Sequence, residues 1–287
     1  MTPAKNLRSI LKVNDIVAAP GAYDALTAKI IEDAGFKAVY MTGYGTSAAH
    51  FGLPDLGFLT MTEMVENAAR IADAIGVPLI ADADTGYGNP MNVVRTVQAY
   101  EKAGASAIHI EDQVWPKRCG HMSGKKVVAA SDMVEKLKAA VDARNDPDFL
   151  IIARTDSIAT HGFDHAVERA HLYAEAGADV MFVEAPRTKE DMANIPKLVP
   201  EKPHLVNMAP LTPNLGIDEL KAMGFSIVLY PGVCLTAAIT ACMEEVGRIA
   251  RTGKQRDFQD VVNAFTELNT WLKTPDFIEM EQKYNTD

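Results

Sequence analysis

The segment from residue 111 to residue 121 carries the strongest chemical signal in the chain, because it places an acid and a thiol close together among cations. An apolar run over residues 107–110 predicts a buried strand that ends at Glu111, and the proline and glycine beyond it predict a loop. Cys119 lies in this loop, and the basic residues beside it are Lys117, Arg118 and His121. We expect these cations to lower the pKa of the thiol and make it available for proton transfer or attack. The alternative is an incidental cysteine in a basic surface turn.

Most other apolar runs also end on residues that could do chemistry. After the second run come Tyr40, Thr42, Gly43 and Tyr44, after the third Asp82 and Asp84, after the fifth Arg154 and Asp156, after the sixth Glu184, and after the seventh Asn207. A single acid at a strand end is usually a solvated loop residue or a helix cap. A charged or amide side chain at the end of nearly every strand is hard to explain by packing.

Three of these acids predict a cation site. Asp82, Asp84 and Glu111 would converge from neighbouring strands of one sheet. Carboxylates this close repel one another, so their pKa values rise unless a cation lies among them. Asp82 and Asp84 are two residues apart and point to one face if the strand continues through both. Oxygen ligands alone favour Mg²⁺, or Mn²⁺, over zinc.

Arg154 and Asn207 supply what an anionic substrate needs. A guanidinium can bind a carboxylate through two hydrogen bonds, and a side-chain amide can donate another. The alternative for Arg154 is a structural ion pair with Asp156 or Glu184.

Size and composition limit the class of protein. The 287 residues are 48% hydrophobic and 23% charged, as in a soluble globular protein. The 28 basic and 38 acidic side chains give a net charge of −10, which argues against nucleic-acid and anionic-membrane partners. Three cysteines without a CxxC pair argue against a disulfide framework or a structural zinc site. Residues 1–14 lack a signal-peptide core and no apolar run has membrane-spanning length, so we expect a cytoplasmic protein.

A repeated unit predicts the fold. Four times, a helical stretch ends at a glycine and an apolar strand follows, at residues 34–41, 103–110, 176–183 and 223–230. Further strands are predicted at residues 16–19, 79–83, 150–153 and 204–206, and helices at 61–75, 91–103, 132–143 and 164–176. Eight strands alternating with helices predict a closed (β/α)8 barrel, with an open doubly wound sheet as the alternative. The nucleotide-binding versions of that sheet are disfavoured, because no glycine-rich phosphate loop follows the first strand.

The end of the chain is predicted to be helical. Helices are expected at residues 236–251 and 258–272, followed by a charged segment from Glu279 to Asp287. This part is too short for a second domain, so residues 1–287 are predicted to form one barrel domain with a helical extension from about residue 236. Its apolar faces are expected to serve a subunit contact.

The chain resembles the isocitrate lyase/phosphoenolpyruvate mutase superfamily from about Val17 to the C-terminal helices. The resemblance rests on the motifs at residues 81–88, 109–114 and 117–121. Residues 115–116 and 122–125 are similar to the subgroup that contains 2,3-dimethylmalate lyase, petal death protein, oxaloacetate acetylhydrolase and 2-methylisocitrate lyase. The segment 117–121 resembles the carbon–carbon lyase signature of this superfamily, which its phosphonopyruvate-processing members lack.

The resemblance implies an assembly and a site. The fold would be a (β/α)8 barrel whose last helix is exchanged with a neighbour, in a homotetramer made of two such dimers. The ligands of Mg²⁺ would be Asp55, Asp82, Asp84 and Glu111. The residues that hold the 2-keto or 2-hydroxy acid end of the substrate would be Tyr40, Thr42, Gly43, Tyr44, Asp82, Arg154, Glu184 and Asn207, and the Cys119 loop would close over the ligand.

One departure from the resemblance concerns the substrate. Isocitrate lyases have two serines where this chain has Ala209 and Leu211. Losing two hydrogen-bond donors leaves the extra carboxylate of isocitrate poorly satisfied and suits an alkyl group instead.

The expected reaction is therefore retro-aldol cleavage of an alkylated 2-hydroxydicarboxylate to a 2-keto acid, such as pyruvate, and a second carboxylate. Cys119 would act as general acid, and Lys117, Arg118 and His121 would balance charge; Tyr44 is a candidate base. The alternatives are hydrolysis of oxaloacetate to oxalate and acetate, and a barrel that binds a keto acid without turnover.

Overall fold

The computed structural model describes residues 2–12 and 15–285, and it divides into two units that meet in sequence at Leu235 and Thr236. The predicted start (residues 1–14) and the predicted charged end (residues 279–287) therefore fall partly outside the described residues. Each unit is described by itself below.

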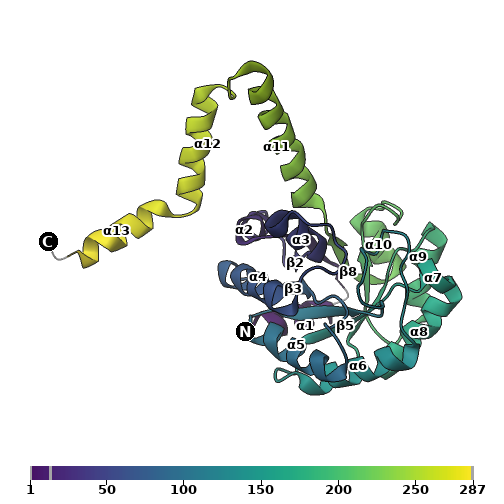
Figure 1. Cartoon of the computed structure of the whole chain (residues 1–287). Coiled ribbons are helices and arrows are strands. Elements are labelled where there is room, and N and C mark those ends of the chain that lie inside the picture. Colours follow the sequence, from purple (N-terminus) through teal and green to yellow (C-terminus); the bar gives the residue numbers. More distant parts are fainter. Residues whose placement is uncertain (1, 13–14, 286–287) are drawn as a thin grey trace. The chain divides into compact units, whose positions relative to one another are not determined.

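The first unit is a barrel of eight parallel strands (Figure 1), closed in chain order because β8 pairs with β1. The strands are β1 (Val17–Ala22), β2 (Val39–Met41), β3 (Leu79–Asp82), β4 (Ala107–Glu111), β5 (Leu150–Thr155), β6 (Val180–Val183), β7 (His204–Asn207) and β8 (Phe225–Tyr230). The predicted (β/α)8 barrel is confirmed, and the open sheet is wrong. Each predicted strand is present with ends shifted by a few residues.

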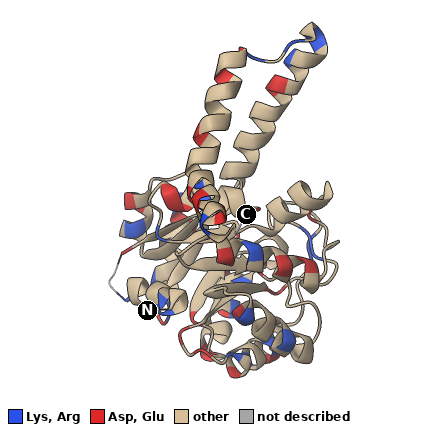
Figure 2. Cartoon of the chain, turned by 90° about the vertical axis from the view of Figure 1, so that its left-hand side faces the viewer, with Lys and Arg blue, Asp and Glu red and all other residues tan. Residues whose placement is uncertain are grey.

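Helices surround this barrel. They are α1 (Pro3–Leu11), α2 (Ala25–Asp33), α3 (Gly43–Phe51), α4 (Met61–Ala74), α5 (Pro90–Lys102), α6 (Ala130–Ala143), α7 (Ile158–His161), α8 (Phe163–Glu175), α9 (Lys189–Leu198) and α10 (Ile217–Met223). Basic and acidic residues are mixed along them (Figure 2). The four glycines predicted to end helices before strands all have positive φ, between +87° at Gly35 and +100° at Gly224. Glycine adopts this conformation without the steric cost of a Cβ, so the chain turns from helix to strand there.

Apolar clusters on both sides of the strands hold the barrel together. Inside it, Ile80, Phe182 and Leu229 pack with other strand residues and with Leu7 of α1, which is fully buried. Outside it, a larger apolar cluster fills the space between strands and helices. Arg8 of α1 donates to Asp179, which lies just before β6, so α1 lies across the end of the barrel where the strands begin. The opposite end, where the strands finish, is left for chemistry.

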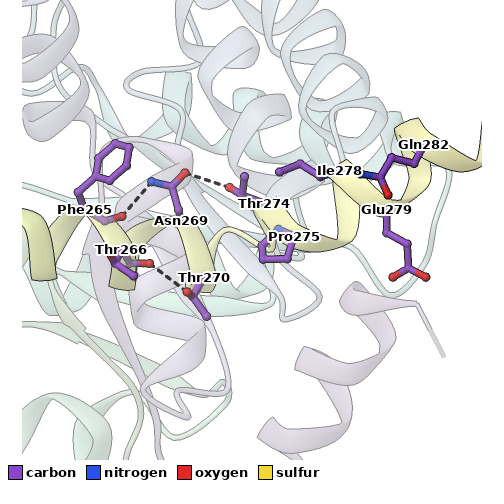
Figure 3. A pocket seen from close by; sticks show the side chains of 9 residues that line it. All are labelled: Phe265, Thr266, Asn269, Thr270, Thr274, Pro275, Ile278, Glu279 and Gln282. Atoms are coloured by element: carbon purple, nitrogen blue, oxygen red, sulfur yellow. Dashed lines mark hydrogen bonds between the residues drawn. The ribbon is translucent and has the colours of Figure 1, made fainter. Parts of the chain in front are cut away.

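The second unit is helical. Its helices are the greater part of α11 (Val233–Thr252), α12 (Phe258–Trp271) and α13 (Thr274–Tyr284), so the charged end of the chain is helical as far as Tyr284. A groove of about 440 Å³ lies between α12 and α13. Figure 3 shows the side chains that line it. These are Phe265, Thr266, Asn269, Thr270, Thr274, Pro275, Ile278, Glu279 and Gln282. Within residues 2–12 and 15–285, no helix combines the length and apolar character needed to span a membrane.

Candidate active site

The carboxyl ends of the strands gather most of the residues that the sequence singled out. Asp82 ends β3, Glu111 ends β4, Arg154 lies near the end of β5 and Glu184 follows β6. All four are buried, and Asn207 at the end of β7 is partly buried. The side-chain amide of Asn207 donates to Oε2 of Glu184 over 3.1 Å.

Arg154 lies at the centre of this group. Its Nη1 is 3.3 Å from Oε2 of Glu111, and its Nη2 is 3.3 Å from Oε2 of Glu184. Its Nε donates to Oδ2 of Asp156 over 2.9 Å, and the guanidinium lies over the ring of Phe182. The ion pairs that the sequence left as an alternative are therefore present. They also fix the orientation in which the guanidinium would meet an anion.

Asp55 and Asp84 share the ammonium of Lys117. Nζ of Lys117 is 2.5 Å from Asp55 and 2.7 Å from Asp84, and all three side chains are buried. The strand does not continue through Asp82 and Asp84, because β3 ends at Asp82 and Asp84 has φ of +46°, so the condition for a shared strand face is not met. A tight turn brings the two acids together instead, and the Asp84 N–H donates to Oδ1 of Asp82.

Two of the acids have raised pKa values. Burial raises the pKa of Asp84 to about 6, with repulsion from Asp82 and Asp55 adding to the effect and Lys117 opposing it. Burial also raises the pKa of Glu111 well above its usual range, against the charge of Arg154. This is the behaviour of buried carboxylates for which the loss of solvation outweighs the attraction of the nearby cations.

The donor set is chemically suited to a hard divalent cation. Asp55, Asp82, Asp84 and Glu111 offer oxygen only, and Oε1 of Glu111 is buried with no hydrogen-bond partner. In the described part of the chain, however, no three acidic, histidine or cysteine side chains are arranged around one point as metal ligands. The ammonium of Lys117 supplies positive charge between two of the acids instead, so cation binding requires these side chains to turn.

Tyr40, a predicted substrate residue, is buried and pairs beside Asp82 with His109, to which the sequence gave no role. The hydroxyl of Tyr40 is 2.9 Å from Nε2 of His109, and that nitrogen is 3.7 Å from Oδ1 of Asp82. Burial lowers the pKa of His109 to about 4, so the ring is neutral near pH 7. A histidine in the middle of an otherwise apolar strand was the signal for this pair. The pair therefore forms the surface beside Asp82 inside the barrel.

The start of α3 faces the same acids. Thr42 caps this helix through a hydrogen bond from the Gly45 N–H over 3.2 Å. Gly43 packs against the carboxylate of Asp82 so closely that a Cβ at this position would overlap it. Tyr44 differs from its neighbours, because 43% of it is exposed and it lies outside the buried cluster.

The loop that carries Cys119 lies over these residues. The Cys119 N–H donates to the carbonyl of Asp55 over 3.1 Å. Gly120 packs against Arg154 and Glu184, and a Cβ on it would lie 2.8 Å from Cγ of Glu184. His121 has Nε2 3.2 Å from Oε1 of Glu184. Its Nδ1 accepts a hydrogen bond from Leu211 N–H over 3.1 Å, which assigns the ring proton to Nε2. The loop is therefore closed.

The expectation that cations lower the pKa of Cys119 is wrong. Burial raises it, with the backbone N–H of His121 and the charge of Arg154 acting in the opposite direction. Lys117 directs its charge to Asp55 and Asp84, and the exposed Arg118 donates to the carbonyl of Ser123. The thiol thus keeps its proton near neutral pH, which suits a proton donor better than a nucleophile.

A second buried hydrogen-bond network lies next to the site, around Asp112. Asp112 follows β4 and accepts four hydrogen bonds, from Thr155, Asp156 N–H, Arg169 and Tyr173. Arg169 also donates to the carbonyl of Val128, at the end of the Cys119 loop. The network ties β4, β5, α8 and this loop together, so it fixes the frame in which Glu111 and Arg154 lie.

Comparison with known proteins identifies the family of this chain. The family model for phosphoenolpyruvate phosphomutase matches residues 7–250. The chain belongs to the phosphoenolpyruvate mutase/isocitrate lyase superfamily. A 2,3-dimethylmalate lyase from Eubacterium barkeri is 47% identical over 288 residues, covering 100% of this chain and 99% of the relative. A 2-methylisocitrate lyase from Aeropyrum pernix is 42% identical over 268 residues, covering 93% and 86%.

Solved structures from the superfamily share the fold over the whole length. A crystal structure of 2,3-dimethylmalate lyase has a TM-score of 0.93 at 38% identity, covering 99% of this chain and 95% of that one. A structure of oxaloacetate acetylhydrolase with the inhibitor 3,3-difluorooxalacetate has a TM-score of 0.92 at 36% identity, covering 100% and 99%. The expectation of an enzyme, a lyase of this superfamily, is confirmed.

The network around Asp112 gives a stability prediction for this superfamily member. Asp112→Asn leaves the buried Arg169 without its counter-charge. It also replaces one accepting oxygen by an NH₂ group, which faces groups that themselves donate. We therefore expect the free energy of unfolding to fall by about 3–5 kcal/mol. Urea unfolding measures it. Glu135→Gln, on the exposed face of α6, is the control and should change stability little. A loss no larger than the control's would contradict the role of Asp112.

Proposed function

We propose that the protein cleaves the C2–C3 bond of a 2-hydroxydicarboxylate that carries alkyl substituents, of the 2,3-dimethylmalate, 2-alkylmalate or 2-methylisocitrate type. The products are a 2-keto acid such as pyruvate and a second mono- or dicarboxylate. The observation that carries the proposal is the closed Cys119 loop, in which Gly120 packs against Arg154 and Glu184 and burial raises the pKa of the neighbouring Cys119 thiol. The name of the relative at 47% identity supports the same reaction.

The described side chains can serve the steps of this cleavage. Arg154 binds a substrate carboxylate, and Thr42, Gly43 and Asn207 surround the 2-oxygen end. The 2-hydroxyl gives its proton to a neighbouring carboxylate of the site as C2 becomes the keto carbon. The C2–C3 electron pair then passes to the distal fragment, and Cys119 donates its proton to C3 of that fragment. Closure of the loop keeps water away from this intermediate. Tyr44 is too exposed to serve as the base that takes the 2-hydroxyl proton.

A divalent cation completes the proposed chemistry. Mg²⁺, or Mn²⁺, would be held by Asp55, Asp82, Asp84 and Glu111, and its charge would stabilise the developing 2-keto acid. Lys117 already compensates two of these acids. We therefore infer that Lys117 balances charge around the acids, while His121 lies beside Glu184 with its Nε2 3.2 Å from Oε1 of that carboxylate.

The distal pocket suits an alkyl group. Leu211 uses its backbone N–H on His121, and both it and Ala209 lack a side-chain donor. The extra carboxylate of isocitrate, which 2-methylisocitrate shares, would find no serine hydroxyl to satisfy it at this position, so an alkylated malate fits best.

The substrate is tested by offering 2,3-dimethylmalate, 2-methylisocitrate and isocitrate with Mg²⁺ in an assay coupled to lactate dehydrogenase. We expect keto-acid formation from an alkylated substrate and little or none from isocitrate. Absence of keto acid from all three would end the proposal.

Hydrolysis of oxaloacetate is the second candidate, supported by the oxaloacetate acetylhydrolase structure with a TM-score of 0.92. Release of oxalate and acetate from oxaloacetate, with no cleavage of alkylated malates, would decide for it. Binding of pyruvate or oxalate without any turnover would indicate a non-catalytic barrel.

We predict that Cys119→Ala lowers kcat by about 10²- to 10⁴-fold, because the general acid is removed. The dissociation constant for pyruvate, measured by calorimetry, should change little. Cys242→Ala, at an exposed thiol in α11, is the matched control. Near-normal kcat in Cys119→Ala would remove this residue from the acid role.

We also predict that chelation abolishes turnover and that added Mg²⁺ or Mn²⁺ restores it. Asp84→Asn should raise the Mg²⁺ concentration needed for half-maximal rate by about tenfold or more, because one ligand charge is lost. Asp73→Asn, an exposed acid on α4, should leave that concentration unchanged. Full activity after exhaustive chelation would contradict the cation site.

The assembly and location are part of the proposal. We infer a cytoplasmic homotetramer, a dimer of helix-swapped dimers, in which neighbouring copies cover the apolar residues of the second unit. Phe258, Phe265 and Phe277 are each more than 60% exposed in the single chain, as expected for faces that await a partner.

A further inference from the structure

Lys125 is a buried cation in the Cys119 loop that the reaction scheme does not use. Its side chain is 2% exposed. The ammonium donates to Oδ1 of Asp156 over 2.9 Å and to the carbonyl oxygen of Gly120. Lys125 therefore joins the residue next to Cys119 to the floor of the site.

The base of the loop is held without Lys125. Val114 N–H donates to Lys126 carbonyl and Val128 N–H donates to Asp112 carbonyl, each over 2.8 Å. The Gln113 side chain also bonds to the Arg118 backbone over 2.8 Å and 3.0 Å. These contacts fix where the loop leaves and rejoins the barrel. They do not hold Gly120 in its place over the site. Other contacts do so, and the one from Lys125 is both charged and buried.

Asp156 connects this loop contact to Arg154. Its Oδ1 accepts from both Lys125 and Nη2 of Arg154, the latter over 3.2 Å, and its Oδ2 accepts from Nε of Arg154. Asp156 is fully buried, and its own N–H donates to Asp112. One carboxylate thus holds the loop cation and the guanidinium proposed to bind substrate.

Burial of the ammonium makes its partner necessary. A buried charge costs several kcal/mol unless it is paired and hydrogen-bonded, so Lys125 is stable inside only while Asp156 and the Gly120 carbonyl are in reach. If the loop opens, the ammonium loses both partners and is better placed in water. The contact therefore favours either a fully seated loop or an open one over intermediate positions.

We propose that Lys125 is a positioning residue that locks the Cys119 loop over the site, and that Asp156 couples this lock to Arg154. Seating the loop places the Cys119 thiol, and an anion bound by Arg154 steadies the carboxylate that holds Lys125. The first half of the proposal concerns the loop alone. The second half rests on the proposed lyase function.

The first test measures how fast iodoacetamide alkylates Cys119 in the full-length protein, followed by mass spectrometry of the peptide. We expect Lys125→Met to raise this rate by about fivefold or more, because the loop spends more time open. Lys126→Met removes an exposed neighbouring cation and should leave the rate unchanged. Alkylation of Cys242 should be equal in all variants, which separates loop opening from general loosening.

The second test uses turnover of an alkylated malate. Lys125→Met should lower kcat by about tenfold or more, because Cys119 is misplaced, while the dissociation constant for pyruvate rises much less. Lys125→Arg keeps the charge and should recover part of kcat and of the protection of Cys119. If the methionine variant does not fold, Lys125→Gln, which keeps a hydrogen-bond donor but loses the charge, takes its place in the alkylation assay and should also raise the rate at Cys119.

The outcomes separate the two proposals. Faster alkylation of Cys119 in a protein that cleaves no alkylated malate would keep the lock and end the lyase proposal. Turnover with unchanged alkylation and unchanged kcat in the Lys125 variants would overturn the lock. Equal acceleration at Cys242 would also overturn it, because the effect would then be general destabilisation.

Discussion

The candidate site depends on one buried guanidinium and the three carboxylates around it. Arg154 pairs with Glu111, Asp156 and Glu184, which lie at the ends of the adjacent strands β4, β5 and β6. All four side chains are buried. Burying such charges is unfavourable unless nearly every donor and acceptor is used. That requirement explains the neighbouring hydrogen-bond network. In it, Asp112 accepts four hydrogen bonds, and Arg169 also donates to the carbonyl of Val128 at the end of the Cys119 loop. The barrel supplies the rigid frame that makes this concentration of charge possible.

Proton affinity at this site follows from the same burial. Cys119 and Glu111 both hold their protons more tightly than they would in water, and His109 remains neutral. The pKa values of the proposed acid, Cys119, and of these neighbours are thus shifted mainly by exclusion of water and not by nearby positive charge. The basic residues next to Cys119 in sequence bind other partners, and the raised pKa of the thiol favours the general-acid role over the nucleophilic one that the sequence also allowed.

The fold could be predicted from the sequence because its signals are local. Each apolar strand, and each glycine such as Gly104 that ends a helix before one, is readable within a short window, and the ends of parallel strands must share one face. Asp82, Glu111 and Arg154 were found on that basis. The direction of the Cys119 pKa shift could not be found in this way, because it depends on what lies around the folded loop. The turn that places Asp84 also required the structure, as did the pairing of Lys125 with Asp156 across 31 positions of the chain.

Separation of the two barrel ends has a practical consequence. At the end where the strands begin, α1 seals the interior with Leu7, and Arg8 and Arg144 both bind Asp179. None of these residues contacts the acids or the Cys119 loop. Thermostability can therefore be engineered at that end, by improved packing or added ion pairs around α1, without the loss of turnover that usually accompanies stiffening near a reaction centre.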